Sequence, residues 1–356
     1  MMQKLAEKFK DNWKRYSLIA LCAVLALVLI VLVFGTVYIH SLLNSLGRVD
    51  PDDEATISAS QAENMMATDP ELETIDPSLD ETLPQLHEEM INLEGVGHEE
   101  HGDHVINILL VGQDRRPGEG RQRSDSMILA TLNKSKNTLT LTSFMRDQYV
   151  EIPGYLPNKL NAAYAFGGFN LLNATLEHNF GVYVDGNIEV DFDGFTGIID
   201  LLGGVEITLT QAEAEYMNVN FATKLTAGTH LLNGYEALSY SRIRKIDTDY
   251  RRAERQRTVI ISLLDRYKQK PVTEMLSILQ SILPMITTDM SNGQILSLAG
   301  EVLPMLSSLQ VNTLRIPVDG TFDQGQVEVR EGLANWFQYH IDFKANYQRL
   351  QSLFEK

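Results

Sequence analysis

The sequence has little cysteine and lacks the common catalytic fingerprints. Its one cysteine, Cys22, lies inside a long apolar run, so the chain that follows this run contains no thiol. This absence excludes disulfides, cysteine nucleophiles and Cys-ligated zinc from that part of the protein. The sequence also has no Walker phosphate loop, no Gly-x-Ser-x-Gly elbow and no dinucleotide fingerprint. A domain of about 250 residues can still bury enough apolar surface to fold without cross-links.

The apolar run predicts a membrane anchor. Residues 17–39 carry no charge, and a helix needs about 20 apolar residues to cross a bilayer. Lysines and an arginine precede the run and acidic residues follow it, so the positive-inside rule places residues 1–16 in the cytoplasm and the rest of the chain outside the cell membrane. A cleaved signal peptide is the alternative, but its apolar core is only ~7–15 residues and ends in small residues. The length of this run and its ending at residues 34–39 favour an uncleaved, single-pass anchor.

Positive charge is absent from residues 50–104. This stretch contains 17 Asp and Glu residues and no Lys or Arg, so it accounts for the whole net charge of −17. It lacks sustained apolar periodicity, and repulsion between its carboxylates favours an extended, solvated chain. We therefore interpret residues 40–104 as an acidic extracytoplasmic linker, with a short helix near residues 83–93, that holds the next domain off the membrane.

Three histidines lie at the end of this linker. His98, His101 and His104 are spaced by three residues, with acidic residues between them. Such a pattern is typical of a weak site for zinc or a similar ion. A flexible polar tail that contains histidine explains the same pattern, and the sequence leaves both alternatives open.

The remaining residues, 105–356, predict one folded domain. Val105–Gly112 is an apolar run typical of a buried strand, and the runs 126–132 and 138–143 read as a hairpin across a polar turn. Strands and helices alternate, which indicates an α/β or α+β fold with a central mixed β-sheet flanked by helices on both faces. Further helices are expected at residues 160–166, 171–180, 192–202, 235–240, 250–267, 275–286, 294–306 and 344–354, and further strands at residues 182–190, 205–210, 311–317 and 326–330.

A cationic run marks the middle of this domain. Seven of the sixteen residues from Arg242 to Arg257 are Arg or Lys, in a chain that is acidic overall. Guanidinium groups match phosphate or carboxylate oxygens in pairs, so the run predicts a strongly anionic ligand. On the helix expected here, Arg252 and Gln256 lie beside the apolar stripe rather than opposite it. A partly buried arginine needs an anionic partner, which strengthens the prediction.

Other cations stand at the ends of predicted elements. Arg242 and Arg244 have alternate spacing, which puts both side chains on one face of an extended stretch. Arg146 follows a predicted strand and Lys159 precedes a predicted helix. Each of these last two residues fits either a ligand-binding cation or an ordinary surface charge.

Two aspartates are candidates for a metal site. Asp114 follows one predicted strand and Asp125 begins the next, so the carboxylates converge if these strands are neighbours. Paired carboxylates with open positions that face a phosphate are a usual way to hold Mg²⁺. Two aspartates in a polar loop, one of which caps a turn, explain the same spacing.

Together these segments resemble the LytR–CpsA–Psr family of membrane-anchored cell-wall enzymes. The residues from 225 to 257 are the most specific match, and the apolar anchor fits the family's usual layout. The chain departs from the family pattern at Gln122 and Arg251, where glycine is common, which puts the local loop shape in doubt. The matching stretches are Ile108–Asp114, Arg123–Met127, Thr142–Asp147, Lys159–Tyr164, Leu225–Arg244 and Asp249–Arg257.

The resemblance implies an enzyme that transfers a glycopolymer from an undecaprenyl-pyrophosphate carrier to peptidoglycan. The polymers of this family include wall teichoic acid and capsular polysaccharide, and the product is a phosphodiester at a muramic-acid hydroxyl. The implied class is a phosphotransferase, with pyrophosphatase activity as a candidate side reaction and Mg²⁺, or alternatively Mn²⁺, as the metal. The implied partners are the lipid-linked glycopolymer, peptidoglycan and membrane lipid, and no nucleic acid is expected.

The resemblance also assigns residues. Asp114 and Asp125 would hold Mg²⁺ at the pyrophosphate. The implied pyrophosphate ligands are Arg146, Lys159, Arg242, Arg244, Arg252 and Gln256, and the implied catalytic residues are Arg146, Arg242, Arg244 and Asp249. The family's lipid tail occupies an apolar cavity under the sheet, although core packing is the better explanation for any single candidate for its wall. These candidates are Phe192, Phe195, Ile198 and Leu202, together with Ile199 and Leu201.

Two functions of other classes stay open. Proteins of this family have often been named transcriptional attenuators, and a basic helix is typical of nucleic-acid binding. The predicted topology opposes this function, because it puts the basic run outside the cell. A non-catalytic receptor for polyprenyl pyrophosphate would use the same arginines without turnover.

Overall fold

The computed structural model describes residues 41, 43–50, 54–69, 71–75, 83–113 and 121–356. The chain divides into two compact units, residues 1–46 and residues 47–356. The predicted membrane anchor, residues 17–39, and the predicted metal ligand Asp114 lie outside the described residues. Within those ranges, the structure has no helix that combines the length and the apolar character needed to cross a bilayer.

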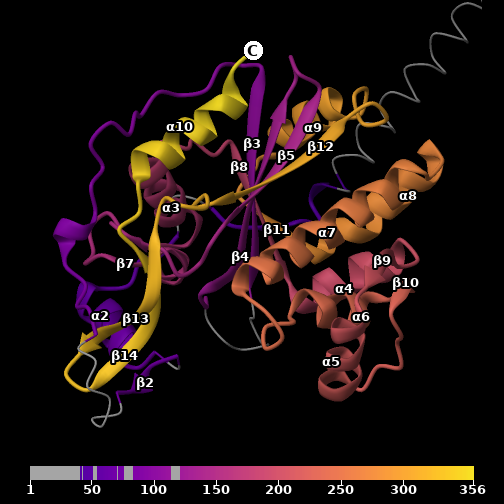
Figure 1. The fold of residues 1–356 in the computed structure, drawn as a ribbon. Coiled ribbons are helices and arrows are strands. Elements are labelled where there is room, and N and C mark those ends of the chain that lie inside the picture. The colour runs from indigo at the N-terminus through magenta and orange to yellow at the C-terminus, as the bar shows by residue number, and fades with distance from the viewer. Residues whose placement is uncertain (1–40, 42, 51–53, 70, 76–82, 114–120) are drawn as a thin grey trace, which may run out of the picture. The chain divides into compact units, whose positions relative to one another are not determined.

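A mixed seven-stranded β-sheet forms the centre of the larger unit (Figure 1). In spatial order its strands are β1 (Gly47–Arg48), β11 (Thr287–Thr288), β8 (Gly186–Asp191), β3 (Val105–Gln113), β4 (Ser124–Asn133), β5 (Thr138–Phe144) and β12 (Gln310–Ile316). β3 pairs with β8 and β5 with β12 in parallel, whereas β4 is antiparallel to both of its neighbours. The predicted mixed sheet and the predicted β4–β5 hairpin are confirmed.

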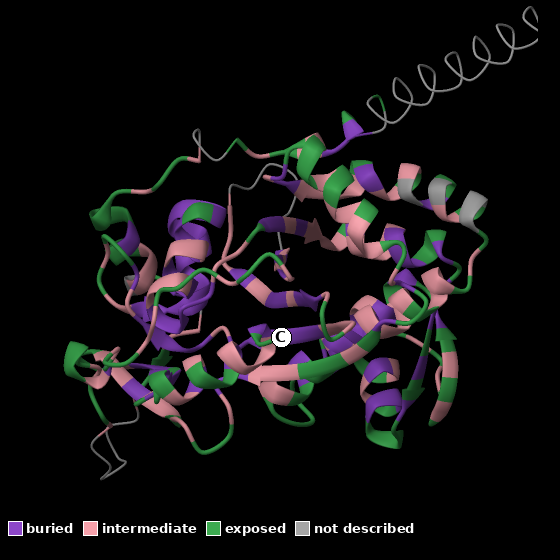
Figure 2. Cartoon of the chain, turned by 90° about the horizontal axis from the view of Figure 1, so that it is seen from above, coloured by how far each residue is buried: buried purple, intermediate pink, exposed green. Residues whose placement is uncertain are grey.

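Helices cover both faces of this sheet. On one face, α3 (Leu160–Phe180) and α10 (Phe343–Phe354) pack on each other and against β4. On the other face, α4 (Phe192–Leu201) lies beside β8, and α7 (Asp249–Lys268) lies beside β5. α8 (Val272–Ile282) and α9 (Asn292–Val302) follow α7 in the chain. Figure 2 shows largely buried strands between helices whose outer sides are exposed.

The two faces of the sheet have different neighbours because side chains alternate along a strand. Leu109 of β3 and Leu129 of β4 belong to the larger hydrophobic core, which contains α3 and α10. Leu110 and Ile128, one residue away in each strand, line a pocket on the α4 and α7 side. The pocket therefore lies on the face of the sheet opposite the larger core.

A smaller lobe lies next to this pocket. It consists of the antiparallel strands β9 (Val205–Leu209) and β10 (Gly228–Leu232) with α5 (Gln211–Phe221) and α6 (Gly234–Ser241). These elements share a second hydrophobic core with α7, which includes Ile207, Leu232 and Val259. The sequence did not predict α5 or β10. The buried residues of α5 are only Glu213, Ala214 and Met217, so this helix has no long apolar stripe.

A two-glycine break divides α3 as the sequence predicts. Gly167 and Gly168 leave helical geometry, with φ angles of −153° and 63°. Beyond the break, the Glu54 carboxylate accepts hydrogen bonds from the backbone N–H groups of Phe169 at 2.7 Å and Asn170 at 2.9 Å. A Cβ at position 168 would stand 1.5 Å from Glu54 Oε1, so both the backbone angle and the close approach require glycine.

The acidic segment packs against the domain, so the prediction of a solvated linker is wrong for its described residues. α2 (Ala59–Ala67) begins with a capping box between Ser58 and Gln61, and Ala62 and Ile91 are buried in the larger core. β2 (Glu73–Thr74) joins β14 (Leu333–Tyr339) and β13 (Asp323–Arg330) in a three-stranded sheet. Instead of the predicted helix at residues 83–93, only Glu88–Met90 forms a 3-10 turn.

The short elements that remain are β6 (Tyr149–Val150), β7 (Asn158–Lys159) and a 3-10 turn at Leu283–Met285.

Candidate active site

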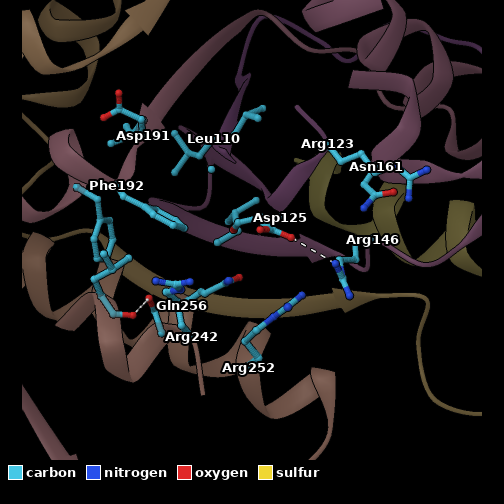
Figure 3. Close-up of a pocket in the computed structure, with 18 of the residues that line it drawn as sticks. Leu110, Arg123, Asp125, Arg146, Asn161, Asp191, Phe192, Arg242, Arg252 and Gln256 are labelled. Carbon is cyan, nitrogen blue, oxygen red and sulfur yellow. Dashed lines mark hydrogen bonds and ion pairs between the residues drawn. The ribbon is translucent and has the colours of Figure 1, made fainter. Parts of the chain in front are cut away.

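The pocket under the sheet has a volume of about 740 Å³ and combines an apolar interior with a charged mouth. The apolar wall comes from β3, β4, β8, α4 and α7, and the charged wall comes from the ends of β4 and β5, from residues 242–256 and from the acidic segment. Figure 3 shows Asp125 and Arg146 joined by an ion pair, with Arg242, Arg252 and Gln256 on the other side of the pocket. A ligand with a charged headgroup and an apolar tail would match both parts.

Arg146 lies at the end of β5, among carboxylates. Its guanidinium nitrogens lie 2.7 Å from Glu71 Oε1, 3.3 Å from Asp125 Oδ1 and 3.8 Å from Asp249 Oδ2. Burial alone would lower the pKa of Arg146, but Asp147, Glu71, Asp249 and Asp125 together raise it above its usual range. Arg146 is therefore a permanent cation at the pocket mouth.

Arg252 contributes a second buried cation from the first turn of α7. Its side chain is 6% exposed and donates to Asp249 Oδ2 at 2.9 Å. Burial, together with the neighbouring Arg146 and Arg244, lowers the pKa of Arg252 to about 10 against the opposing effect of Asp249. A buried guanidinium whose pKa is lowered in this way is incompletely neutralised, so the site favours an additional anion.

Arg242 and Arg244 complete the cationic wall at the end of α6. The guanidinium of Arg242 lies over the ring of Phe192 at 4.8 Å, which holds it at the border between the charged and apolar parts. Arg244 is 41% exposed, and its Nη2 lies 3.5 Å from Asp125 Oδ1. Gln256 lines the same wall one turn beyond Arg252. The predicted residues Arg146, Arg242, Arg244, Arg252 and Gln256 thus lie around one pocket.

Lys159 is placed differently from the sequence prediction. Its ammonium is 1% exposed and does not line the pocket. It lies 3.0 Å from Asp147 Oδ1, 3.1 Å from Glu71 Oε2 and 2.9 Å from Asn335 Oδ1. In this arrangement Lys159 holds Glu71 and Asp147 and does not face the pocket directly.

Glu71 is the principal charged residue of the pocket that sequence reasoning missed. Burial would raise the pKa of Glu71, but Arg146 and Lys159 outweigh that effect and lower it to about 2. Its neighbour Asp69 pairs with Arg123 at 2.5 Å and accepts from Asn335 at 3.0 Å. No local pattern distinguishes these two acids from the others in the same segment, so only the fold identifies them.

The structure describes one of the two predicted metal ligands. Asp125 lines the pocket and is paired with Arg146 and Arg244, while Asp114 lies outside the described residues. Hard carboxylate oxygens at a cationic anion site are a suitable donor set for Mg²⁺ once a phosphate adds its own charge. The described part of the chain contains no group of three or more His, Cys, Asp or Glu side chains arranged to hold a metal ion.

The three histidines of the acidic segment have separate partners. His101 Nε2 lies 3.1 Å from Asp185, and His104 Nε2 lies 2.8 Å from the carbonyl of Phe354. The ring of His98 stacks on His178. The structure therefore does not support a metal site formed by these three residues together.

The apolar part of the pocket contains most of the residues predicted for a lipid tail. Phe192, Phe195, Ile198 and Ile199 of α4 line it. The other two candidates are not on its wall: Leu202 is 2% exposed and buried in the protein, and Leu201 is 40% exposed. The helical repeat turns Leu201 away from the pocket, whereas Leu202 follows the last residue of α4 and is buried outside the pocket wall. The assignment of both residues to this wall is therefore corrected.

Two further arginines of α7, Arg255 and Arg257, face the protein interior, whereas Arg251 is exposed. Arg255 is 4% exposed and binds Glu213 at 2.7 Å together with Asp247. Arg257 is 8% exposed and donates to the hydroxyl of Ser143 at 2.6 Å. The cationic run therefore contains residues that line the pocket, buried residues that hold the helix in place and exposed residues such as Arg251.

Comparison with known proteins gives a consistent result. The family model described as "LytR_cpsA_psr family" matches residues 60–341. A protein of Bacillus anthracis (strain A0248) named polyisoprenyl-teichoic acid–peptidoglycan teichoic acid transferase TagU is 32% identical over 250 residues, which are 68% of this chain and 80% of that protein. The protein of Bacillus subtilis (strain 168) named for the same activity, TagT, is 35% identical over 175 residues, which are 47% of this chain and 54% of TagT. The match thus spans about half the length of TagT.

The chain is also similar to a protein named as a regulator and to solved structures of TagT. The regulatory protein MsrR of Staphylococcus aureus (strain COL) is 38% identical over 164 residues, 45% of this chain and 49% of MsrR. The crystal structure of B. subtilis TagT has a TM-score of 0.57 at 26% identity and covers 76% of this chain and 99% of that structure. A structure described as TagT bound to LI-WTA has a TM-score of 0.59 at 26% identity, with 73% and 94% covered.

Proposed function

The chain belongs to the LytR–CpsA–Psr family, as its motifs predicted, and from this premise we propose that it is a membrane-anchored glycopolymer–peptidoglycan phosphotransferase. Its donor would be a glycopolymer on a polyprenyl-pyrophosphate carrier, and its acceptor would be peptidoglycan outside the cell membrane. The relatives TagU and TagT, which are named as teichoic acid transferases, support this choice of substrates. The observation that carries the proposal is the group of arginines at the mouth of an apolar pocket.

The two parts of the pocket match the two parts of such a donor. A diphosphate would lie among Arg146, Arg244 and Arg252, where a buried guanidinium lacks full neutralisation. The polyprenyl chain would lie against Phe195 and Ile198 under the sheet. A nucleic acid offers phosphates without an apolar tail, and Arg255 and Arg257 of the basic helix are buried and engaged within the protein. The pocket therefore favours a lipid diphosphate over a duplex.

The reaction needs positioning and charge neutralisation more than a covalent nucleophile. The acceptor oxygen forms a bond to the phosphorus that carries the glycopolymer, the P–O bond to the polyprenyl phosphate breaks, and the acceptor proton passes to a carboxylate or to water. Arg146, Arg242, Arg244 and Arg252 would stabilise the charge on the transferred and departing oxygens. Asp249 orients two of these arginines through its contacts at 2.9 Å and 3.8 Å.

A divalent metal is part of the proposal. Asp125, together with Asp114, would hold Mg²⁺ or Mn²⁺, and when bound the ion would neutralise diphosphate oxygens. Asp125 accepts a hydrogen bond from Arg146 and lies beside Arg244. A metal ion bound to this carboxylate would therefore lie next to the anion site. With water in place of the glycan hydroxyl, the same chemistry would give pyrophosphate cleavage as a side reaction.

The test uses the full chain in detergent with Mg²⁺, a polyprenyl-pyrophosphate glycan and soluble peptidoglycan strands. We expect polyprenyl phosphate to be released and the glycan to become attached to the strands, and we expect EDTA to stop both. A protein that binds the donor with no turnover under these conditions would be a receptor, and the transferase proposal would be overturned.

A further inference from the structure

A second pocket adjoins the first on the other side of Arg146. It has a volume of about 580 Å³, and Arg146 and Glu71 line both pockets. Its outer wall is the three-stranded sheet of β2, β13 and β14, and its inner wall is the start of α7. Any ligand in this second pocket would therefore lie directly beside the place assigned above to the diphosphate.

The lining of the second pocket differs in kind from that of the first. It consists mostly of amide side chains, carboxylates and two aromatic residues, Tyr250 and Trp336. Trp336 is 46% exposed, although its neighbours Asn335 and Phe337 in β14 are almost fully buried. An exposed indole beside a row of amides is a surface that can cover the apolar face of a sugar ring while the amides bind its hydroxyl groups.

The amide groups are held in place by one another. Gln338 Nε2 donates to the Tyr250 hydroxyl at 3.3 Å, and the same hydroxyl donates to Gln324 Oε1. Gln326 Nε2 donates to Glu73 Oε2 at 2.8 Å. Each of these bonds uses one N–H of Gln338 or Gln326, and neither involves the amide oxygen of these residues.

The amide oxygens of these two glutamines are available to accept hydrogen bonds from a ligand. The Oε1 atoms of Gln326 and Gln338 have no hydrogen-bond partner among the residues described, and Gln338 as a whole is only 3% exposed. A buried acceptor without a partner costs free energy, and most such groups in folded proteins are satisfied. A hydroxyl or an N-acetyl N–H group from a bound sugar would satisfy both oxygens.

The charge of this pocket selects between two sources of sugar. Four carboxylates line it, from Glu71, Glu73, Asp147 and Asp249. They face Arg146 on the pocket wall, and Lys159 and Arg252 behind it, so the balance of charge among these groups is still negative. A glycopolymer that carries phosphate groups would be repelled by these carboxylates, whereas an uncharged glycan strand would not. The pocket is therefore better suited to the acceptor than to the polymer of the donor.

We propose that this second pocket, which we name the glycan pocket, holds one sugar ring of the peptidoglycan acceptor, with the ring face against Trp336. This assignment rests on the proposed transferase function. It places an acceptor hydroxyl near Arg146 and Glu71, within reach of a diphosphate in the first pocket. Two substrates held on either side of one arginine would bring the acceptor hydroxyl close to the diphosphate, as phosphoryl transfer requires.

The chain offers a direct reporter for this proposal, because it contains only two tryptophans, Trp13 and Trp336. In the variant Trp13→Phe, the full chain in detergent has Trp336 as its one indole. Titration with peptidoglycan glycan oligomers, without donor, should give a saturable change in its fluorescence. If only the donor-linked polymer produces the change, the pocket belongs to the donor and the acceptor assignment is overturned.

Kinetics supply the second measurement. Trp336→Ala should raise the KM for glycan strands about tenfold, the usual scale for loss of an aromatic contact. Trp336→Phe keeps an aromatic face and should restore most of the affinity. Tyr235→Ala is the matched control, because Tyr235 is 55% exposed and lines neither pocket. An unchanged KM in Trp336→Ala would overturn the proposal.

The two measurements also separate this proposal from the function on which it rests. If the oligomers change the fluorescence of Trp336 but no polymer is transferred, the glycan pocket is supported and the transferase function fails. If transfer proceeds normally while the oligomers have no effect on Trp336 at any concentration, the function stands and the glycan pocket is rejected.

Discussion

The Glu71 carboxylate and the Arg146 guanidinium lie 2.7 Å apart, although they come from segments separated by 75 residues in the sequence. Glu71 also lies 3.1 Å from Lys159 and 3.8 Å from Arg244. An acidic side chain thus occupies part of the space in which an incoming diphosphate would need the same cations. Binding of the donor must therefore compete with an internal carboxylate.

Replacing Glu71 by Gln should tighten binding of the diphosphate. The substitution removes a negative charge from the anion site but keeps the size of the side chain, so we expect about fivefold lower Kd for a polyprenyl pyrophosphate. Isothermal titration with the full chain in detergent measures this change. Glu63→Gln, an exposed residue of α2 outside both pockets, is the control and should leave the Kd unchanged. Weaker binding in Glu71→Gln would mean that the carboxylate orients Arg146 for the ligand instead of competing with it.

The same carboxylate should make stability depend on acid pH. The pKa of Glu71 is about 2 in the folded protein against an ordinary value of 4.5, so its ion pairs stabilise the fold fully above pH 4.5 and are lost as the pH falls towards 2. The side chain is 34% exposed, so solvent screening reduces the contribution to about 1 kcal/mol. Urea unfolding of the wild type and Glu71→Gln should show a difference at pH 6 that shrinks by pH 3. A difference that grows on acidification would contradict this sign.

Much of the fold follows from local sequence patterns. Apolar runs and their turn residues predicted β3, the β4–β5 hairpin and α7, because hydrophobic spacing and Gly or Asn breaks are read within a few residues. The arginines around the first pocket were predicted from the density of positive charge and from family motifs. An arginine is a cation that binds anions whatever its neighbours are, so these residues can be recognised without knowledge of the fold.

The part of the site that was not predictable depends on contacts between distant segments. Glu71 reaches Arg146 because β2 pairs with β14, in which Thr74 lies opposite Leu333. That pairing joins residues more than 250 positions apart in the sequence. The strand β2 has only two residues, which is too short for a recognisable hydrophobic pattern. Composition favoured a solvated segment, but arginines of the domain neutralise three of its acids, Glu54, Asp69 and Glu71.

Arg244 should be essential for transfer but dispensable for folding. Its guanidinium is 41% exposed, so its loss leaves no buried charge without a partner, yet it lines the anion site. Arg244→Ala should lower the rate of transfer by about 10²-fold or more, the usual cost of losing one group that stabilises developing charge. The melting temperature should stay within a few degrees of the wild type. Arg251→Ala removes an exposed arginine that pairs only with Glu254 in the described structure, and it should transfer normally.

Arg255, in contrast to Arg244, should be needed for stability but not for transfer. Its buried guanidinium binds Glu213 at 2.7 Å and also pairs with Asp247, and it lies on neither pocket wall. Arg255→Ala would leave Glu213 buried without its partner, so we expect the free energy of unfolding to fall by about 3 kcal/mol. The activity of the fraction that remains folded should stay near the wild-type value. A loss of activity in fully folded protein would place Arg255 in the site after all.

Phe195 should matter only for donors with a long lipid chain. Its ring lines the apolar part of the first pocket, where α4 faces the underside of the sheet, and it is also packed against the second core. Phe195→Ala removes apolar contact area worth about 1–2 kcal/mol, so the KM for a long polyprenyl donor should rise roughly tenfold. A donor with a chain too short to reach Phe195 should show the same KM in the wild type and the variant. Because a general loss of packing would weaken both donors alike, an equal rise for the short and the long donor would show that Phe195 supports the fold and does not contact the lipid.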